Sequence, residues 1–337
     1  METKTMQFKH CVIEGTPYGA GKLLGEMFKD DTGFVRFMTS PFMGGNKLSK
    51  SKVIKAMEFY DKFNPGVNEE IKGFADAVGA DAEDIVYYYA YVQPSVGNCS
   101  HMVVLPSITE DRHIYHARSY EYGWDNRPIL FTSRIEDKYQ QIGFGCQLFG
   151  RFDGINECGL SVSTSAGVIR PDIKDEGCVF PVVVRTLLDR CKDVEEAVEI
   201  IMNMPISDYR NFIVADRNGN AALIEVASSC KVVKYIGGET GDQFLCSANH
   251  YALPEMIKHD VGRMWHSVAR YKAIEAQIST SVPIVTKDII RGILSNTVPN
   301  GACCNHYSDG MGTLWSILFD PMGCKVEICF GSPNINQ

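Results

Sequence analysis

The stretch 97–105, GNCSHMVVL, divides this sequence of 337 residues into two parts of different character. Before it, apolar residues recur at spacings of three and four, which is typical of amphipathic helices. After it, short runs of β-branched and aromatic residues are separated by turn sequences, which is typical of strands. The sequence therefore predicts a helical segment over 1–98 and a larger domain over 99–337, which begins at Cys99.

Within the first segment, turn and cap residues delimit the expected helices. Asn64-Pro65-Gly66 interrupts the helical pattern, Gly79 is suited to end a helix, and Asp81 is suited to begin the next one. Helices are predicted over 21–30, 48–63, 67–78 and 81–90.

The larger domain is predicted to belong to the α+β class. Strands are predicted over 101–105, 113–119, 129–135, 140–144, 159–165, 211–216, 221–226, 231–235, 244–248, 314–319 and 325–330. Helices are predicted over 181–189, 194–204, 266–277 and 286–294. Residues 109–112 and Asn218-Gly219 are turn sequences between neighbouring strands, so antiparallel hairpins are expected. Hairpins with helices inserted between them indicate a layered architecture rather than a parallel βαβ sheet.

Composition excludes several classes of protein. Hydrophobic residues make up 45% and charged residues 22% of the chain, as in soluble globular proteins. No run approaches the roughly 18 apolar residues of a membrane helix. The net charge is −8 and no basic tract is present, so a nucleic-acid partner is not expected. Residues 1–10 lack the apolar region of a secretory signal, and a cytoplasmic location is the default expectation.

The twelve cysteines do not form a recognisable metal motif. There is no C-x-x-C pair, and adjacent Cys303 and Cys304, with His306, are poorly arranged as joint zinc ligands. Free thiols are the simpler interpretation, and no metal or prosthetic group is predicted.

Cys99 is a candidate nucleophile because of where it stands. If the chain were cut before it, its own α-amine could act as a base with a pKa near about 8. The predicted hairpin would bring Arg118 back beside the start of the first strand, where a guanidinium stabilises a thiolate. Spacing alone does not distinguish Cys99 from the other eleven cysteines. On that basis a buried structural thiol remains the commoner interpretation.

Two alternatives belong to other functional classes. His101, His250 or His306 could complete a Cys-His site of the papain type, although papain-like thiols begin a helix and Cys99 enters a β-prone run. The chain could also be a non-catalytic small-molecule-binding protein with the fold of an enzyme.

Several motifs occur together in a definite order. They are Gly97-Asn98-Cys99-Ser100, Arg118-x-x-Glu121, Gly154-Ile155-Asn156-Glu157-Cys158-Gly159-Leu160, Ser247-Ala248-Asn249-His250, Ser267-Val268-Ala269-Arg270-Tyr271, and Thr313-Leu314-Trp315-Ser316 followed by Phe319-Asp320 and Phe330-Gly331. In this order the chain resembles the N-terminal nucleophile (Ntn) hydrolases of the acyl-CoA:6-aminopenicillanic acid acyltransferase type, to which choloylglycine hydrolases and penicillin V acylases are related. Residues 65–90 are similar to the helical propeptide of that family.

The resemblance implies an αββα sandwich and self-cleavage between Asn98 and Cys99. By position, Cys99 matches the nucleophile, with its α-amine as the general base, and Arg118 matches the arginine that orients and activates the thiol. Asn249 matches a side-chain donor of the oxyanion hole, and Arg270 matches a second active-site arginine.

Two positions depart from the family pattern. Glu121 stands where the family usually has aspartate, and Asp125 is a substitute for it. Ala166 stands where choloylglycine hydrolases have a further oxyanion asparagine, which argues against bile-salt hydrolysis. Asn156 is interpreted as a turn residue.

The predicted function is that of a self-processing cysteine amidohydrolase or N-acyltransferase. It would cleave a linear amide or an acyl thioester through an acyl-cysteine, with acyl-CoA as one candidate substrate. Residues 1–98 are expected to stay bound to 99–337 after the cut, because amphipathic helices need a partner surface. Association of identical chains is left open.

Overall fold

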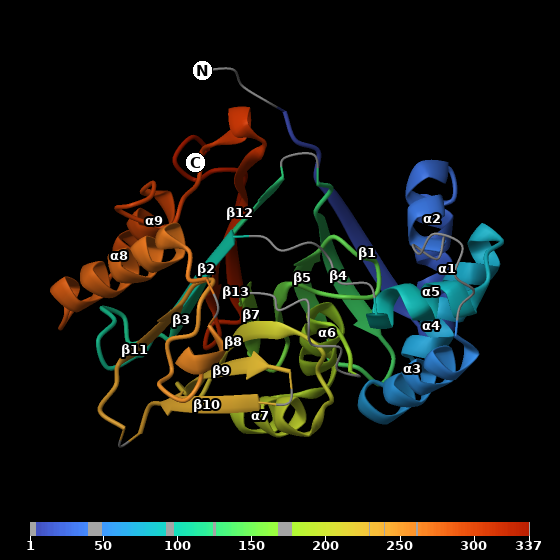
Figure 1. Cartoon of the computed structure of the whole chain (residues 1–337), viewed down its shortest axis with the longest axis horizontal. Coiled ribbons are helices and arrows are strands. Elements are labelled where there is room, and N and C mark those ends of the chain that lie inside the picture. Colours follow the sequence, from blue (N-terminus) through green and yellow to red (C-terminus); the bar gives the residue numbers. More distant parts are fainter. Residues whose placement is uncertain are drawn as a thin grey trace.

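The computed structural model of the chain, shown in Figure 1, describes residues 5–39, 49–91, 98–123, 126–167, 177–228, 230–238, 240–260 and 262–336. Its strands form two sheets. Across the eight-stranded sheet the order is β1 (Lys9–Gly15), β4 (Ile129–Ile135), β5 (Gln141–Gly145), β6 (Asp153–Asn156), β7 (Ser161–Ala166), β8 (Tyr209–Ala215), β9 (Ala221–Ala227) and β10 (Cys230–Ile236). Across the five-stranded sheet it is β11 (Phe244–Ser247), β2 (Asn98–Val104), β3 (Tyr115–Gly123), β12 (Met311–Asp320) and β13 (Lys325–Phe330).

The two sheets pack face to face, with helices on both outer faces (Figure 1). Strand β2 lies against β7 and β8 of the other sheet. Helices α6 (Phe180–Arg190) and α7 (Val194–Asn203) cover the eight-stranded sheet, and α8 (Trp265–Ser281) and α9 (Lys287–Ser295) cover the five-stranded sheet. The predicted α+β class and αββα layering are therefore confirmed.

The central strands β8 and β9 of the eight-stranded sheet are apolar because both of their faces are buried. Every residue of β8 and β9 is buried, because one face packs on α7 and the other lies between the sheets. Polar residues that do occur between the sheets therefore need hydrogen-bond partners inside the protein.

The N-terminal segment is not purely helical, which corrects the prediction for 1–98. It contains α1 (Pro17–Phe28), α2 (Thr32–Thr39), α3 (Lys50–Phe63), α4 (Val67–Val78) and α5 (Ala82–Tyr91), but it begins with strand β1. Strand β1 pairs in parallel with β4, with Cys11 opposite Phe131. Cys11 and Ile13 are buried and their neighbours are more exposed, a two-residue alternation too short to stand out in the sequence.

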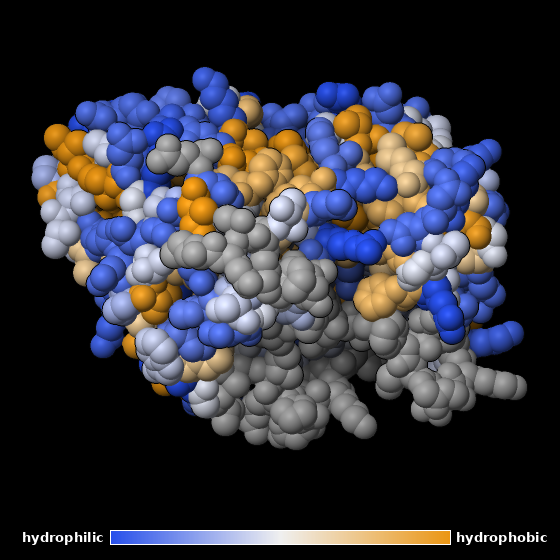
Figure 2. Space-filling view, turned by 90° about the horizontal axis from the view of Figure 1, so that it is seen from above, coloured by the Kyte–Doolittle hydropathy of each residue, from blue (hydrophilic) through white to orange (hydrophobic). Residues whose placement is uncertain are grey.

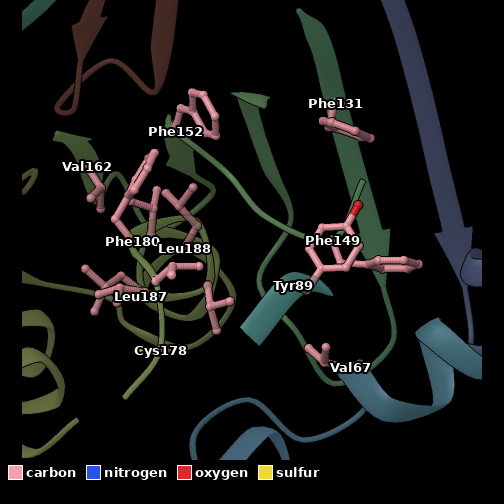
Figure 3. Packing of buried hydrophobic residues seen from close by; sticks show 14 of the residues in the cluster. Val67, Tyr89, Phe131, Phe149, Phe152, Val162, Cys178, Phe180, Leu187 and Leu188 are labelled. Atoms are coloured by element: carbon pink, nitrogen blue, oxygen red, sulfur yellow. The ribbon is translucent and has the colours of Figure 1, made fainter. Parts of the chain in front are cut away.

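The N-terminal segment and the larger domain share one hydrophobic core. Figure 3 shows Val67 and Tyr89 in the same cluster as Phe131 and Phe149 of the larger domain. The rings of Tyr89 and Phe149 lie 4.9 Å apart between centroids, and Phe74 also packs edge-on against Phe149. The N-terminal segment is thus an integral layer of the core.

On the face seen in Figure 2, hydrophobic residues are interspersed with hydrophilic ones. Over the described ranges, no helix combines the length and the apolar character needed to cross a bilayer.

Candidate active site

Cys99 is the second residue of β2, which lies between β11 and β3 in the five-stranded sheet. Its side chain is only 2% exposed. In the register of β2 and β3, Cys99 lies opposite Tyr120 and His101 lies opposite Arg118. Side chains alternate along a strand, so these four residues share one face of the sheet.

Arg118 connects the thiol to the opposite sheet. Its Nη2 donates to Cys99 Sγ at 3.4 Å. Its Nη1 donates to Asp153 Oδ2 at 2.6 Å and to the carbonyl of Phe152 at 2.7 Å. The guanidinium is 1% exposed, so its charge acts on the thiol with little screening by water. The hairpin predicted from the sequence therefore brings Arg118 to the thiol.

Burial and charge act in opposite directions on these groups. Burial raises the pKa of the Cys99 thiol above its usual value, while the Arg118 guanidinium lowers it. Burial alone would lower the pKa of Arg118, but Cys99 and Asp153 hold it above its usual range. Arg118 therefore remains a fixed cation, and the thiol is the group that can titrate.

Asp153 is a site residue that the sequence reasoning missed. It is fully buried at the start of β6, where its Oδ2 also accepts from Trp315 Nε1 at 2.9 Å and its Oδ1 accepts from the amide of Phe144 at 3.2 Å. These contacts fix the carboxylate that orients Arg118. The only available signal was its place directly before the Gly154-Ile155-Asn156 motif, in a region that was not predicted to be a strand.

Arg270 approaches Cys99 from the other face of the sheet, on helix α8. Its Nη1 donates to the carbonyl of Cys99 at 2.5 Å and to Ser100 Oγ at 2.6 Å, and its Nη2 donates to Asn249 Oδ1 at 2.7 Å. The side chain is 2% exposed, so it is not the solvated surface residue that an amphipathic helix also allows.

Glu121 also lies on this second face, opposite Asn98 in the register of β2 and β3. Its Oε1 accepts from Ser119 Oγ, and its Oε2 lies 3.7 Å from Arg270 Nη1. Burial raises the pKa of Glu121 to about 7, although Arg270 opposes the shift. Glu121 is thus linked to the Cys99 carbonyl through Arg270, on the face of the sheet opposite the thiol. Its suggested substitute, Asp125, lies outside the described residues.

Asn249 follows β11 and faces the backbone of Cys99. Its Oδ1 accepts from the peptide nitrogen of Cys99 at 2.9 Å, and its Nδ2 donates to the carbonyl of Ala166 at 2.9 Å. The two donors at Oδ1, from Cys99 and Arg270, fix which end of the amide is oxygen. The structure thus brings Cys99, Arg118, Asn249 and Arg270 together from strands β2 and β3, the loop after β11 and helix α8.

The geometry gives no support to a papain-like site. Cys99 begins a strand, and its described hydrogen-bond donor is Arg118 rather than an imidazole. The Nδ1 atoms of His101 and His250 contact Ser163 Oγ and Ser267 Oγ at 2.6 and 2.7 Å, and the His306 side chain is 71% exposed.

Asn156 is buried at the end of β6, where it holds the turn into β7. Its Nδ2 donates to the carbonyls of Leu188 and Cys191, and its Oδ1 accepts from the amides of Cys158 and Leu160. These contacts fit the turn role predicted for it.

The pair Cys303 and Cys304 has no metal-site geometry. Cys303 Sγ lies 3.0 Å from Ser332 Oγ. Within the part of the chain that the structure describes, no group of three or more His, Cys, Asp or Glu side chains is placed to hold a metal ion.

Comparisons with solved structures find similar folds at low sequence identity. An N-acylethanolamine-hydrolyzing acid amidase ortholog from Caenorhabditis elegans has a TM-score of 0.46 and 16% identity, over 66% of this chain and 93% of that one. Penicillin V acylase from Agrobacterium tumefaciens has a TM-score of 0.43 and 19% identity, over 69% and 83%. A mutant conjugated bile acid hydrolase from Clostridium perfringens has a TM-score of 0.43 and 12% identity, over 69% and 92%.

A comparison with curated protein sequences gave no significant match. The model of one protein family matches residues 104–335 and is described as acyl-coenzyme A:6-aminopenicillanic acid acyl-transferase. The match begins shortly after Cys99 and includes Arg118, Glu121, Asn249 and Arg270. Because it spans well over half of the chain, this protein belongs to the acyl-coenzyme A:6-aminopenicillanic acid acyl-transferase family.

Proposed function

We propose that this protein is a self-processing cysteine amidohydrolase or N-acyltransferase with Cys99 as its nucleophile. The observation that carries the proposal is the position of Cys99, whose thiol lies beside the Arg118 guanidinium and whose backbone nitrogen lies beside the Asn249 side-chain amide. Arg118 Nη2 lies 3.4 Å from the thiol, and Asn249 Oδ1 lies 2.9 Å from the backbone nitrogen. Family membership supports the class of reaction.

The first step is the cut between Asn98 and Cys99. The Cys99 sulfur attacks the Asn98 carbonyl carbon, the peptide C–N bond breaks, and the nitrogen takes the proton that the thiol gives up. The α-amine of Cys99 is then free, and water hydrolyses the resulting thioester, which leaves a carboxylate on Asn98 and frees the thiol of Cys99. The new amine stays beside Asn249 Oδ1, since the peptide nitrogen already lies there.

In the cut protein, the amine and the thiol act together on substrate. The neutral amine takes the thiol proton while Arg118 stabilises the thiolate. The thiolate attacks the acyl carbon of a linear amide or acyl thioester, and the amine or thiol of the substrate leaves with a proton. Water or an acceptor amine then releases the acyl group from Cys99. Arg270 holds the Cys99 carbonyl throughout.

A substrate screen tests this function directly. N-acyl amino acids, penicillins, conjugated bile salts and acyl-CoA thioesters are incubated with purified protein, and released amine or thiol is measured with and without an acceptor amine. Turnover of at least one class that is lost in Cys99→Ala supports the proposal. Because Ala166 replaces an asparagine of the bile-salt branch, conjugated bile salts are expected to be poor substrates.

Replacing Asn249 by alanine is expected to lower kcat by on the order of a hundred-fold, because it removes a donor used mainly in the transition state. Asn249→Asp is the matched variant, since it retains an oxygen toward Cys99 and Arg270 but loses the donor nitrogen. Both variants should be impaired in turnover, and thermal unfolding measures separately the stability lost with the Asn249 hydrogen bonds to Cys99, Arg270 and Ala166. Near-normal turnover in both would remove Asn249 from the oxyanion hole.

Replacing Arg118 by leucine is expected to move the pH profile of Cys99 alkylation to higher pH, because a neighbouring cation favours the thiolate. Iodoacetamide labelling is followed peptide by peptide with mass spectrometry, so that Cys99 is distinguished from the other thiols. Arg151→Leu is a matched control, since Arg151 is equally buried but donates to Leu148, Gly150 and Ser133 instead. Uniform, slow labelling of Cys99 in every variant would instead favour a non-catalytic binding protein.

A further inference from the structure

Three polar side chains form a row across the inner face of the eight-stranded sheet. Ser165 on β7 lies opposite Asn211 on β8, and Asn211 lies opposite Glu225 on β9. All three side chains are 0% exposed. We call these three residues the polar row.

Burying polar groups in this place costs free energy unless they form hydrogen bonds. Strands β8 and β9 are otherwise dominated by apolar residues, and the row faces the space between the two sheets. Burying an amide or a carboxylate without partners costs on the order of 1–3 kcal/mol or more per group. The partners of the row therefore indicate what it is for.

The partners are backbone atoms on both sides of Asn249. Asn211 Nδ2 donates to the carbonyl of Ala248 at 2.8 Å and to the carbonyl of His250 at 3.1 Å. Ser165 Oγ donates to the same Ala248 carbonyl. One side-chain amide thus holds the two carbonyls that flank Asn249.

Three further hydrogen bonds support the segment 248–253. Glu225 accepts from the amides of Ala252 and Leu253, at 2.7 and 3.1 Å. From the opposite side, the amide of Asn249 itself donates to Ser267 Oγ on helix α8 at 2.8 Å. The backbone of Asn249 is therefore held between the eight-stranded sheet and helix α8.

We propose that the polar row positions the Asn249 side chain for catalysis, with Asn211 as its principal positioning residue. This inference rests on the proposed role of Asn249 in stabilising the oxyanion. Asn211 acts on the reaction through the backbone of Asn249 and does not touch the substrate. Because hydrogen-bond stabilisation of a transition state depends steeply on geometry, a small shift of residues 248–250 reduces the rate without weakening substrate binding.

The test is a double-mutant cycle with p-nitrophenyl butyrate, an activated ester whose attack by a thiolate passes through the same kind of oxyanion. Asn211→Asp has the same shape but turns oxygens, instead of donor hydrogens, toward the two carbonyls. We expect its kcat to fall roughly ten- to a hundred-fold while its KM changes by less than about twofold. When Asn249 is already alanine, adding Asn211→Asp should lower kcat by no more than about twofold.

Asn156→Asp is the matched structural control. Asn156 is also buried and its Nδ2 also donates to two carbonyls, but it holds a turn at the end of β6, whereas Asp153, which contacts Arg118, begins that strand. Asn156→Asp should lose about as much stability as Asn211→Asp but keep the kcat of the wild type. If Asn211→Asp does not fold, Glu225→Gln, which keeps one acceptor oxygen, takes its place with an expected loss of roughly three- to tenfold in kcat.

The outcomes separate the positioning role from the proposed function. If Asn249→Ala impairs turnover but Asn211→Asp does not, or if the two losses multiply, the positioning role is overturned. If Cys99→Ala hydrolyses the ester as fast as wild type, or wild type does not hydrolyse it, the proposed function is contradicted instead. A crystal structure of Asn211→Asp then decides the positioning role alone, since an unmoved Asn249 overturns it and a displaced segment 248–250 supports it.

Discussion

Cys99→Ala is expected to purify as a single chain of 337 residues, whereas the wild-type protein yields two chains, 1–98 and 99–337. Alanine has no nucleophile to attack the Asn98 carbonyl, so the acyl shift cannot begin. The reacting bond lies at the start of β2, where Asn98 Nδ2 contacts Met311 Sδ at 2.9 Å and Arg270 holds the Cys99 carbonyl. Intact-mass measurement distinguishes one chain from two without any substrate.

Cys246→Ala is the matched control for this experiment. Cys246 is also buried in the five-stranded sheet, on the neighbouring strand β11, but it lies opposite Met102. This variant should be cut as completely as wild type. The uncut Cys99→Ala chain should also lack activity, because it has neither the thiol nor the amine. A wild-type protein that is active as one uncut chain would refute the self-cleavage mechanism.

Arg185→Leu is expected to lower the free energy of unfolding by about 3–5 kcal/mol, the usual cost of breaking a buried ion pair by removing one partner. Arg185 on α6 lies 3.1 Å from Glu70 on α4 and 2.8 Å from Asp189, and all three side chains are buried. Its removal leaves two buried carboxylates; Asp189 retains Lys138 at 3.1 Å, whereas Glu70 has no other ion-pair partner among the residues that the structure describes. Urea denaturation measures the loss.

The same substitution tests how the two chains are held together. Glu70 belongs to 1–98 and Arg185 to 99–337, so this buried ion pair crosses between the two proposed chains. After cleavage, the wild-type chains should comigrate in size-exclusion chromatography, and Arg185→Leu should lower the urea concentration at which the smaller chain separates. Arg291→Leu, which breaks the exposed ion pairs with Asp288 and Glu327, should change stability by less than about 1 kcal/mol. Separation of the wild-type chains would contradict the expected association.

Local signals predicted most of the helices and hairpins. Helix α4 begins and ends as predicted, because Gly66 and Gly79 flank it with φ values of 91° and 71° that favour glycine. Strand β1 was missed because its partner β4 follows more than a hundred residues later, and no local pattern encodes that pairing. Strand β6 was missed because it is short and rich in turn residues.

The residues of the candidate site likewise include some that local sequence signals predict and others that they do not. The position of Arg118 beside Cys99 follows from one hairpin, which the sequence predicts. Asn249 and Arg270 were singled out by the family resemblance, since no spacing relates them to Cys99. Asp153 and Asn211 were missed because they reach the site from the opposite sheet, and sheet-on-sheet contacts depend on the whole fold.

The pairing of β1 with β4 has a consequence for the order in which the protein can assemble. Strand β1 is translated first, but it has no partner until β4 has left the ribosome. An unpaired strand edge is a site of unwanted association, and in the finished protein β1 covers the edge that β4 would otherwise expose. Strand β1 therefore replaces β4 as the edge of the eight-stranded sheet, and this edge becomes complete only after both strands have been synthesised.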